Sequence, residues 1–484
     1  MAQRQQLPIM LSNIRSTAID GRLLNPIYRK TLLRDLHNAL SDHITDIQDA
    51  IVNDTGKQSS EAKAETWLSL QLLADAYVSI RPDQAVKQEY AIARGEDLSN
   101  NREPIGIVIV HPSVHCFFFS LMSALVPAFS AGNCVVVQAD WSLSQTHSLV
   151  LGLISRTLDD DVFFTTDKEI KETDLRHRHI HVLQDGPKNI DAPYRLLSNP
   201  EALITAIVER DANIATAAKS LAMARFGLQG SSPYAPDLIL VNELVKDQLA
   251  AAVVEQIGRF KAEASNNSGR TAGFADGGIL HEIQGCKDTD IIFSNPDGTV
   301  IDIKNRQSCI SQRKVKGRCL ALHAVTSMDD AIDLSNSLGR VAASYVFTTN
   351  SAAKYICQFL DGPVAFVNHI PLALLFNPIA PENTVYNPKL RNFYTQNLFS
   401  VPKASFVVAC HDDQILEEAL YEKSAQNLSL LDQQASTKIV GFSRPKRGAA
   451  IGFFEQGIII GGILTISISV SLIGVLGYWV ARYR

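Results

Sequence analysis

The sequence contains few features that would assign it to a secreted or a nucleic-acid-binding class. Its seven cysteines are widely spaced and form no CxxC pair: they lie at positions 116, 134, 286, 309, 319, 357 and 410. An odd number of scattered thiols indicates a reducing compartment rather than a disulfide framework. The net charge of −5 and the absence of a basic tract exclude the usual electrostatic footprint of a nucleic-acid partner.

The first residues, MAQRQQLPIMLSNIRS, lack a long apolar core, so we expect no secretory signal. The 484 residues exceed what one hydrophobic core usually serves, which predicts two or three domains.

One long hydrophobic run stands near the C-terminus. Residues 457–480 include no charged side chain, and as a helix these 24 residues would extend about 36 Å, enough for a hydrocarbon core of about 30 Å. Tyr478 and Trp479 stand where an interfacial aromatic belt would lie. We therefore expect a single-pass transmembrane helix at 457–480, acting as a tail anchor because four residues follow it, with the bulk of the chain cytosolic. The alternative is a buried core helix. The target organelle (endoplasmic reticulum, mitochondrial outer membrane or peroxisome) stays open.

The rest of the chain reads as helices followed by alternating strands and helices. Apolar positions recur at three and four residues from Pro26 to about Tyr77, with a helix stop at Asp54–Gly56. Strands are predicted at Tyr90–Arg94 and at several fully apolar segments: 105–110, 133–138, 180–184, 238–241, 343–347 and 362–369. Helices are expected between them, and one more at 413–426. Continuous apolar strands that alternate with helices favour an α/β fold with parallel sheets covered on both faces.

Five segments in order resemble the aldehyde dehydrogenase superfamily, most of all its class-3-like, membrane-anchored branch. They are EPIGIV (103–108), LVPAFSAGNCVVVQ (125–138), APDLILVNELVKDQL (235–249), TSMDDAIDLSNS with ASYVFTTN (326–350), and GPVAFVNHI (362–370). The resemblance covers roughly residues 15–408.

The resemblance implies an α/β fold with a Rossmann-type NAD(P) domain, a catalytic-type domain, an oligomerisation hairpin and a C-terminal transmembrane helix. The expected segments are N-terminal helices and the cofactor-type domain over 1–206 with a hairpin at about 88–104, the catalytic-type domain over 207–366, and a C-terminal return over 367–410 with a strand at SFVVAC. A polar linker would follow over 411–456, before the transmembrane helix at 457–480. The resemblance also implies a homodimer.

The family's chemistry uses a Cys thiolate, a Glu base and an Asn oxyanion donor. At the position of the nucleophile, two residues before Ala235-Pro236-Asp237, this chain has Pro233, which lacks both a nucleophile and a backbone N–H. Asn199 stands at the base position, and Val114 stands at the oxyanion position. The catalytic set is therefore predicted to be degenerate.

The expected cofactor positions are altered as well. Gln138 replaces the Lys that would contact the adenosine ribose, and Asp185-Gly186 stand in the turn that would face the diphosphate, where a carboxylate is repulsive. Lys314 and Lys316 replace the acidic and aromatic residues that would hold the nicotinamide half. We therefore expect no cofactor. NAD(P) would bind only under the alternative of an active oxidoreductase that oxidises a lipophilic aldehyde to an acid in a specialised metabolic pathway.

Other reactive side chains have simpler interpretations. Ser231, Ser232 and Cys116 flank the altered site, but no base partner is identifiable, so we expect hydroxyls that satisfy local backbone and an ordinary buried thiol. His177, His179 and His181 alternate along a strand without completing a metal site. The cations at 313, 314, 316 and 318 are interpreted as a solvated loop, with a site for an anionic ligand or a lipid headgroup as the alternative. Two hypotheses remain: a tail-anchored pseudoenzyme that serves as a membrane-bound partner or scaffold, and the altered oxidoreductase.

Overall fold

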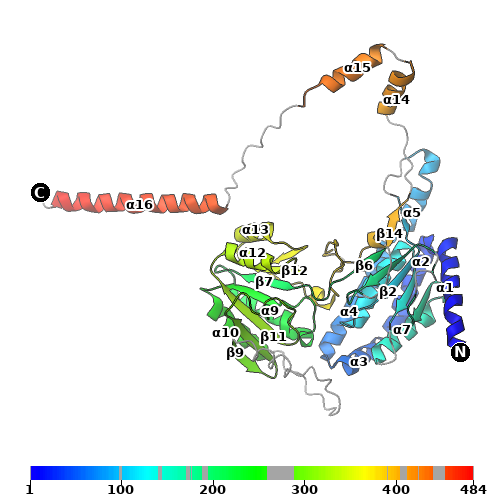
Figure 1. The fold of residues 1–484 in the computed structure, drawn as a ribbon, viewed down its shortest axis with the longest axis horizontal. Helices are drawn as coiled ribbons and strands as arrows, with labels where there is room; N and C mark the ends of the chain where they lie inside the picture. Colours follow the sequence, from blue (N-terminus) through cyan, green and yellow to red (C-terminus); the bar gives the residue numbers. More distant parts are fainter. Residues whose placement is uncertain are drawn as a thin grey trace. The chain divides into compact units, whose positions relative to one another are not determined.

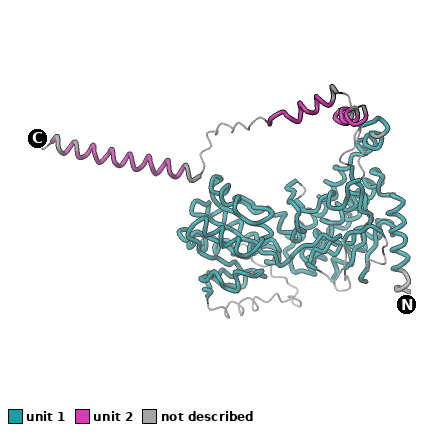
Figure 2. The backbone as a smooth tube through the Cα atoms, turned by 45° about the horizontal axis from the view of Figure 1, so that its top comes forward, with its two compact units in different colours: residues 1–406 teal, residues 407–484 magenta. Residues whose placement is uncertain are grey.

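The computed structural model describes residues 2–96, 101–139, 144–170, 175, 177–187, 194–258, 288–389, 391–403, 411–422, 425–439 and 453–482. The chain divides into two compact units, residues 1–406 and 407–484 (Figure 2).

Helices precede the first sheet in the larger unit. They are α1 (Ala2–Asp20), α2 (Pro26–Asp42), α3 (Ile44–Thr55), α4 (Ser59–Ser79) and α5 (Pro82–Glu89), with 3-10 turns η1 (Arg22–Leu24) and η2 (Ile92–Arg94). The apolar stripe of α2 is buried, as its periodicity predicts. The helix stop at Asp54–Gly56 is confirmed, because Gly56 takes a left-handed conformation (φ 66°) directly after α3. The helical stretch from Pro26 is nevertheless interrupted, since His43 separates α2 from α3.

The first sheet has five parallel strands (Figure 1). Their spatial order is β4 (Phe163–Thr166), β3 (Cys134–Gln138), β2 (Ile107–His111), β5 (His179–Leu183) and β6 (Arg195–Leu197). All residues of β2 and β5 are buried, and the apolar helix α6 (Phe117–Ala131) packs against the sheet and α4, while α7 (Gln145–Thr157) packs on α3. The prediction of parallel strands from continuous apolar runs is confirmed.

The second sheet has seven strands, and six of them are parallel to one another. The order is β13 (Ala365–Val367), β12 (Ala343–Phe347), β7 (Ile204–Val208), β8 (Leu238–Asn242), β11 (Cys319–Val325), β10 (Gly298–Ile303) and the antiparallel edge strand β9 (Thr289–Asn295). The helices of this half are α9 (Ile214–Phe226), α10 (Lys246–Ile257), α12 (Met328–Ser337) and α13 (Asn350–Phe359). The cofactor-type segment was expected to end at residue 206, which falls inside β7. Because β6 belongs to the first sheet and β7 to the second, the chain passes from one sheet to the other between these two strands.

A small two-stranded sheet joins distant parts of the larger unit. β1 (Arg102–Pro104) pairs antiparallel with β14 (Ser400–Pro402), which follows the 3-10 turns η5 (Leu372–Phe376) and η6 (Gln396–Phe399). The strand predicted at Tyr90–Arg94 is wrong: this segment is the end of α5 and the turn η2. The short apolar run directly follows α5, which begins at Pro82, and it forms a further helical turn. The strand predicted at SFVVAC lies outside the described residues.

The smaller unit is helical where it is described. It contains α14 (His411–Glu417), a π-helical turn η7 (Glu418–Glu422), α15 (Ala425–Ser436) and the 30-residue α16 (Phe453–Arg482), which is red in Figure 1. The helix predicted at 413–426 agrees with the described residues, which are helical over 413–422 and from 425; residues 423 and 424 lie outside the described residues. Within α16, Gln456–Leu476 is long and apolar enough to cross a membrane, with a mean hydropathy of 2.4 and no buried residue.

Two backbones cross closely beside the loop that precedes β8. Gly230 has a φ of 70°, and a Cβ atom added there would lie 2.3 Å from the carbonyl carbon and oxygen of Gly317. Only glycine combines this conformation with such a close approach of two main chains. Gly230 therefore fixes the distance between the loop before β8 and the loop before β11.

We predict that Gly230→Ala destabilises the protein by at least about 2 kcal/mol, because neither backbone can move away cheaply. Gly227→Ala is the matched control: it lies in the same turn, η3 (Gly227–Gly230), but a Cβ there meets nothing within 4 Å. Urea unfolding should show a change within about 0.5 kcal/mol for the control. Equal stability of the two variants would contradict the close crossing.

Candidate functional site

A pocket of about 450 Å³ lies where the carboxyl ends of β2 and β5 face the loops that precede β7, β8 and β11. The carboxyl edge of a parallel sheet is the usual place for ligands in α/β folds. The lining residues come from seven segments of the chain: 54–57, 113–116, 184–185, 200–201, 229–233, 314–317 and 378–379.

Five of the predicted site residues line this pocket together, and three do not. Val114, Asp185, Pro233, Lys314 and Lys316 are on its wall. Among the other three, Gln138 ends β3 and accepts a hydrogen bond from the backbone of Ile170, and Gly186 packs against Pro200.

Asn199, expected at the base position, is exposed outside the pocket wall. Its Oδ1 accepts from the backbone N–H of Glu201 at 3.2 Å. Pro200 and Glu201 occupy the wall instead. The side chain of Asn199 thus stabilises its own turn.

A carboxylate in the loop after β5, that of Asp185, faces the loop after β2. Asp185 Oδ2 accepts a hydrogen bond from the backbone N–H of Val114 at 2.9 Å, and Gln184 Oε1 accepts from Ser113 N at 2.9 Å. These bonds join the loop after β2 to the loop after β5. They also use the Val114 N–H and place a negative charge beside it, so this wall does not attract an anion.

Lys314 holds the loop of Pro233 from the other side. Its ammonium group donates to the carbonyl oxygen of Pro233 at 2.5 Å and to that of Ala202 at 2.8 Å, and it pairs with Asp237 at 3.1 Å. Burial lowers the pKa of Lys314, and Asp237 opposes this effect. The solvated loop predicted for the cations near 314 is therefore wrong for Lys314, although the Lys316 side chain is 77% exposed.

The loop before Pro233 is strained. Leu228 and Gln229 have φ values of 50° and 57°, which are uncommon for residues other than glycine. Side chains and backbone from the N-terminal helices hold this conformation: Leu228 N donates to Glu61 Oε1 at 2.6 Å, and Gln229 Nε2 donates to Gly56 O at 2.5 Å. Strain of this kind persists only where surrounding contacts determine it.

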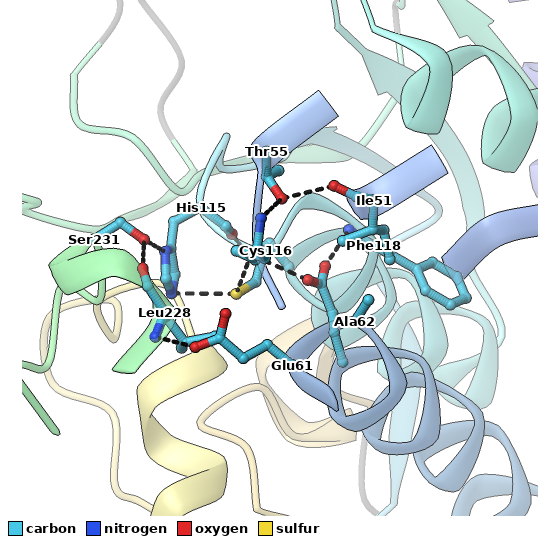
Figure 3. Close-up of polar contacts among 12 residues, drawn as sticks. Ile51, Thr55, Glu61, Ala62, His115, Cys116, Phe118, Leu228 and Ser231 are labelled. Carbon is cyan, nitrogen blue, oxygen red and sulfur yellow. Dashed lines mark hydrogen bonds and ion pairs between the residues drawn. The ribbon is translucent and has the colours of Figure 1, made fainter. Parts of the chain in front are cut away.

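Both serines of this loop satisfy nearby backbone, as predicted. Ser231 Oγ donates to Leu228 O at 2.7 Å, and Ser232 Oγ donates to Leu375 O at 2.8 Å. Ser231 Oγ also lies 3.4 Å from His115 Nδ1, a partner that the sequence did not indicate (Figure 3).

Cys116 has partners that the sequence did not indicate (Figure 3). Lys57 Nζ lies 3.2 Å from Cys116 Sγ and 3.2 Å from Glu65 Oε2, and His115 Nε2 lies 3.4 Å from the same sulfur. Lys57 Nζ and His115 Nε2 thus both face a thiol on the pocket wall. The expectation of an ordinary buried thiol without partners is thus corrected. Lys57 follows the helix stop at Gly56, and nothing in its local pattern connects it to a residue 59 positions later.

The charge state of this cluster follows from burial. Burial raises the pKa of the Cys116 thiol, and the nearby Lys57 ammonium only partly offsets this. Burial acts to lower the pKa of Lys57, but Cys116 and Glu65 together raise it above its ordinary value. Burial, together with Lys57, lowers the pKa of His115 to about 3. At neutral pH the cluster therefore holds a thiol, an ammonium paired with Glu65, and a neutral imidazole.

Two of the alternating histidines, His179 and His181, lie in strand β5 of the first sheet, His177 precedes that strand, and none of the three lines this pocket. His181 stacks on His111, with ring nitrogens 3.2 Å apart, and burial lowers the pKa of His181 to about 4. Within the described part of the chain, no group of three or more His, Cys, Asp or Glu residues could hold a metal.

Comparisons with known proteins agree with this fold and its topology. A model of the aldehyde dehydrogenase family matches residues 10–184. The chain is therefore similar in sequence and fold to the aldehyde dehydrogenase superfamily.

The region matched by this chain covers about three quarters or more of the length of each curated relative. The 4,4'-diaponeurosporen-aldehyde dehydrogenase of Staphylococcus aureus is 24% identical over 67% of this chain and 76% of the relative. The dimeric NADP-preferring aldehyde dehydrogenase of Rattus norvegicus is 22% identical over 71% and 82%, and family 3 member B2 of Mus musculus is 24% identical over 72% and 78%. The likeness is thus to class 3.

A solved structure supports the same fold. The substrate-bound AldH of Staphylococcus aureus has a TM-score of 0.66 at 20% identity, covering 83% of this chain and 94% of the other.

We predict that acid destabilises this protein partly through His115. The pKa of His115 in the folded chain, about 3, lies below the ordinary value of 6.5. Between these two pH values the unfolded chain therefore binds a proton at His115 that the folded chain does not bind. The stabilising contribution is complete above about pH 6.5 and is lost as the pH falls toward about 3, at no more than about 1.4 kcal/mol per pH unit for one proton.

His115→Gln should therefore reduce the slope of unfolding free energy against pH in this window, measured by urea titrations at several pH values. His369→Gln, which changes an exposed histidine, serves as the control and should keep the native slope. Identical slopes for the native protein and His115→Gln would contradict this assignment.

Proposed function

We propose that this chain is a membrane-anchored aldehyde dehydrogenase-like protein that does not oxidise aldehydes by the family's cysteine mechanism and serves as a membrane-bound partner or scaffold, as a homodimer. The observation that supports it most is the state of the nucleophile position. Pro233 lies on the pocket wall, and the Lys314 ammonium binds its carbonyl oxygen at 2.5 Å. A proline there offers no nucleophile and no N–H for an oxyanion.

The oxyanion position supports the same proposal. Val114 has an apolar side chain, and its backbone N–H already donates to Asp185. A developing negative charge at this wall would meet the Asp185 carboxylate. The interaction would therefore disfavour the transition state that an oxyanion hole normally stabilises.

The residues around the pocket do not fit a nicotinamide dinucleotide. A diphosphate favours backbone N–H groups at a helix N-terminus and positive charge, whereas Asp185 places a carboxylate at the expected turn. Lys314, at the position that would hold the nicotinamide ribose, is committed to Pro233, Ala202 and Asp237. The proposed function therefore does not involve NAD(P).

Cofactor titration tests this proposal. The protein lacking α16 is titrated with NAD⁺ and NADP⁺ while intrinsic fluorescence is followed, and we expect no saturable signal. Micromolar binding would instead support the alternative, an NAD(P)-dependent oxidoreductase for a lipophilic aldehyde, which the names of the relatives favour.

Restoring the family residues should not restore oxidation. We predict no acid product from the double variant Pro233→Cys with Asn199→Glu, because residue 199 is exposed outside the pocket wall and Val114 and Asp185 remain. Product is measured by mass spectrometry with an aldehyde and either nicotinamide cofactor. Pro233→Ser with Asn199→Gln controls for folding, and acid formation above this control would contradict the proposal.

The anchor is tested separately. The apolar segment within α16 supports membrane insertion by a single helix, with the larger unit in the cytosol. We predict that deleting residues 457–480 releases the protein from isolated membranes into the supernatant. Deleting α15, residues 425–436, is the control and should leave the protein in the membrane fraction. Retention after the first deletion would mean that the protein is anchored by another part of the chain.

A further inference from the structure

A second cavity, of about 860 Å³, lies at the small two-stranded sheet. It is lined by residues of α2, of α5 and η2, of the end of α6, and of β1, η6 and β14, together with Glu96 and Asn101. Figure 1 shows α2, α5 and β14 side by side in this part of the larger unit. None of the lining residues also lines the pocket of Pro233, so the cavity is a separate candidate site.

Positive charge dominates this cavity, although the whole chain carries a net charge of −5. Four cations line it beside one carboxylate: Arg29, Lys87, Arg94, Arg102 and Glu96. Arg94 neutralises that carboxylate with two hydrogen bonds of 2.8 Å, from Nε to Oε1 and from Nη2 to Oε2 of Glu96. Among the described residues, no carboxylate lies within 4.0 Å of the side-chain nitrogens of the other three cations. Three positive charges of the cavity are therefore available to an anion.

Two of these cations are held in place mainly by backbone oxygens. Arg102, on β1, donates from Nε to Ser400 Oγ at 2.8 Å and from Nη2 to the carbonyl oxygens of Asn397 and Ser400, at 3.0 and 2.5 Å. Arg29, on α2, donates from Nη1 to the carbonyl oxygen of Ser130 at the end of α6. These bonds occupy three carbonyl oxygens that would repel an anion, and they fix both guanidinium groups before a ligand arrives.

Arg29 also has a donor that is not satisfied. Its Nε is buried and has no hydrogen-bond partner among the described residues. Burial lowers the pKa of Arg29, and no carboxylate of the described residues offsets this effect. A buried cation without an anionic partner carries a desolvation cost, which a bound anion would reduce.

The other polar groups of the lining suit a ligand that also carries hydroxyl groups. They include four amide side chains: Gln88, Asn101, Gln396 and Asn397. An amide can both donate to and accept from a hydroxyl group, whereas guanidinium and ammonium groups are the usual partners of phosphate. A cavity of this size holds a whole small molecule. The lining therefore favours a phosphorylated polyol over an inorganic ion.

We propose that this cavity binds a phosphorylated polyol, with Arg29, Lys87 and Arg102 facing its phosphate group and the amide side chains facing its hydroxyl groups. Such a ligand has two sources. One is the headgroup of a membrane lipid, because the chain carries the apolar helix α16, and the other is a free polyol phosphate. The inference goes beyond the proposed function, because the site lies outside the pocket of Pro233 and uses none of its residues.

The test uses the full chain in detergent micelles without NAD(P). Dioctanoyl phosphatidylinositol 4-phosphate and soluble myo-inositol 1,4-bisphosphate are titrated separately by isothermal calorimetry, with empty micelles as the blank. We expect saturable binding of both ligands and none of myo-inositol, which lacks a phosphate group. Binding of the lipid that is tighter by about tenfold or more assigns the headgroup source, and similar affinities assign the free polyol phosphate.

Variants of the lining cations locate the binding. Lys87→Gln and Arg102→Gln should each weaken binding by about tenfold or more, as expected for losing one charged donor. Lys219→Gln and Arg340→Gln are the matched controls: they remove exposed cations outside the cavity and should keep the native affinity. Lys87 is exposed on α5, so Lys87→Gln decides the question if Arg102→Gln fails to fold, which circular dichroism melting shows.

Four outcomes overturn the inference. They are no saturable binding of either phosphorylated ligand, binding of myo-inositol as tight as theirs, native affinity in Lys87→Gln, and an equal loss of affinity in the control variants. Because the sample contains no NAD(P) and the Pro233 pocket is unchanged, the result is independent of the cofactor and oxidation tests above.

Discussion

The buried carboxylate of Asp237 is the interaction on which the rest of this site depends. Its Oδ1 accepts from Arg225 at 3.1 Å and from Val315 N at 3.0 Å, and its Oδ2 accepts from Ile204 N at 2.9 Å and pairs with Lys314 at 3.1 Å. One side chain thus joins the start of β7, the loop before β8 and the loop before β11. Buried charges are stable only when all their partners are present, so the three segments are held as one body.

This network explains how the loop that contains Pro233 is held in place without any contact from a reactive side chain at position 233. Arg225 also donates to the carbonyl oxygens of Pro236 and Val315, at 2.5 and 2.7 Å. The segment Ala235-Pro236-Asp237 therefore has a structural role that is independent of any nucleophile two residues earlier. The contacts that hold this loop come from residues 228–232, from Lys314 and from the segment 235–237, and none of them uses the side chain at position 233.

The sequence predicted features that depend on local pattern and missed those that depend on contacts between distant segments. Fully apolar strands such as β2 and β8 were predictable, because burial on both faces leaves no alternation. The segment Tyr90–Arg94 was not, since five residues of mixed polarity fit a strand or the end of a helix equally well. At the site, Pro233, Val114 and Asp185 line one pocket, whereas Asn199 lies outside it and Glu201, two residues later, is on the wall.

The partners of Cys116 were also not predictable from the sequence, because they come from distant segments of the chain. The sequence displayed a cysteine in the loop before an apolar helix, which on its own is most simply a buried thiol. Its character is set by Lys57, which enters from the turn between α3 and α4, and by a histidine tautomer that Leu375 fixes from another part of the chain. The pocket thus presents a thiol on the loop after β2 and a proline on the loop before β8. The opposite wall contributes a carbonyl oxygen that Lys314 already binds and the Ser231 hydroxyl, which lies 3.4 Å from His115 Nδ1.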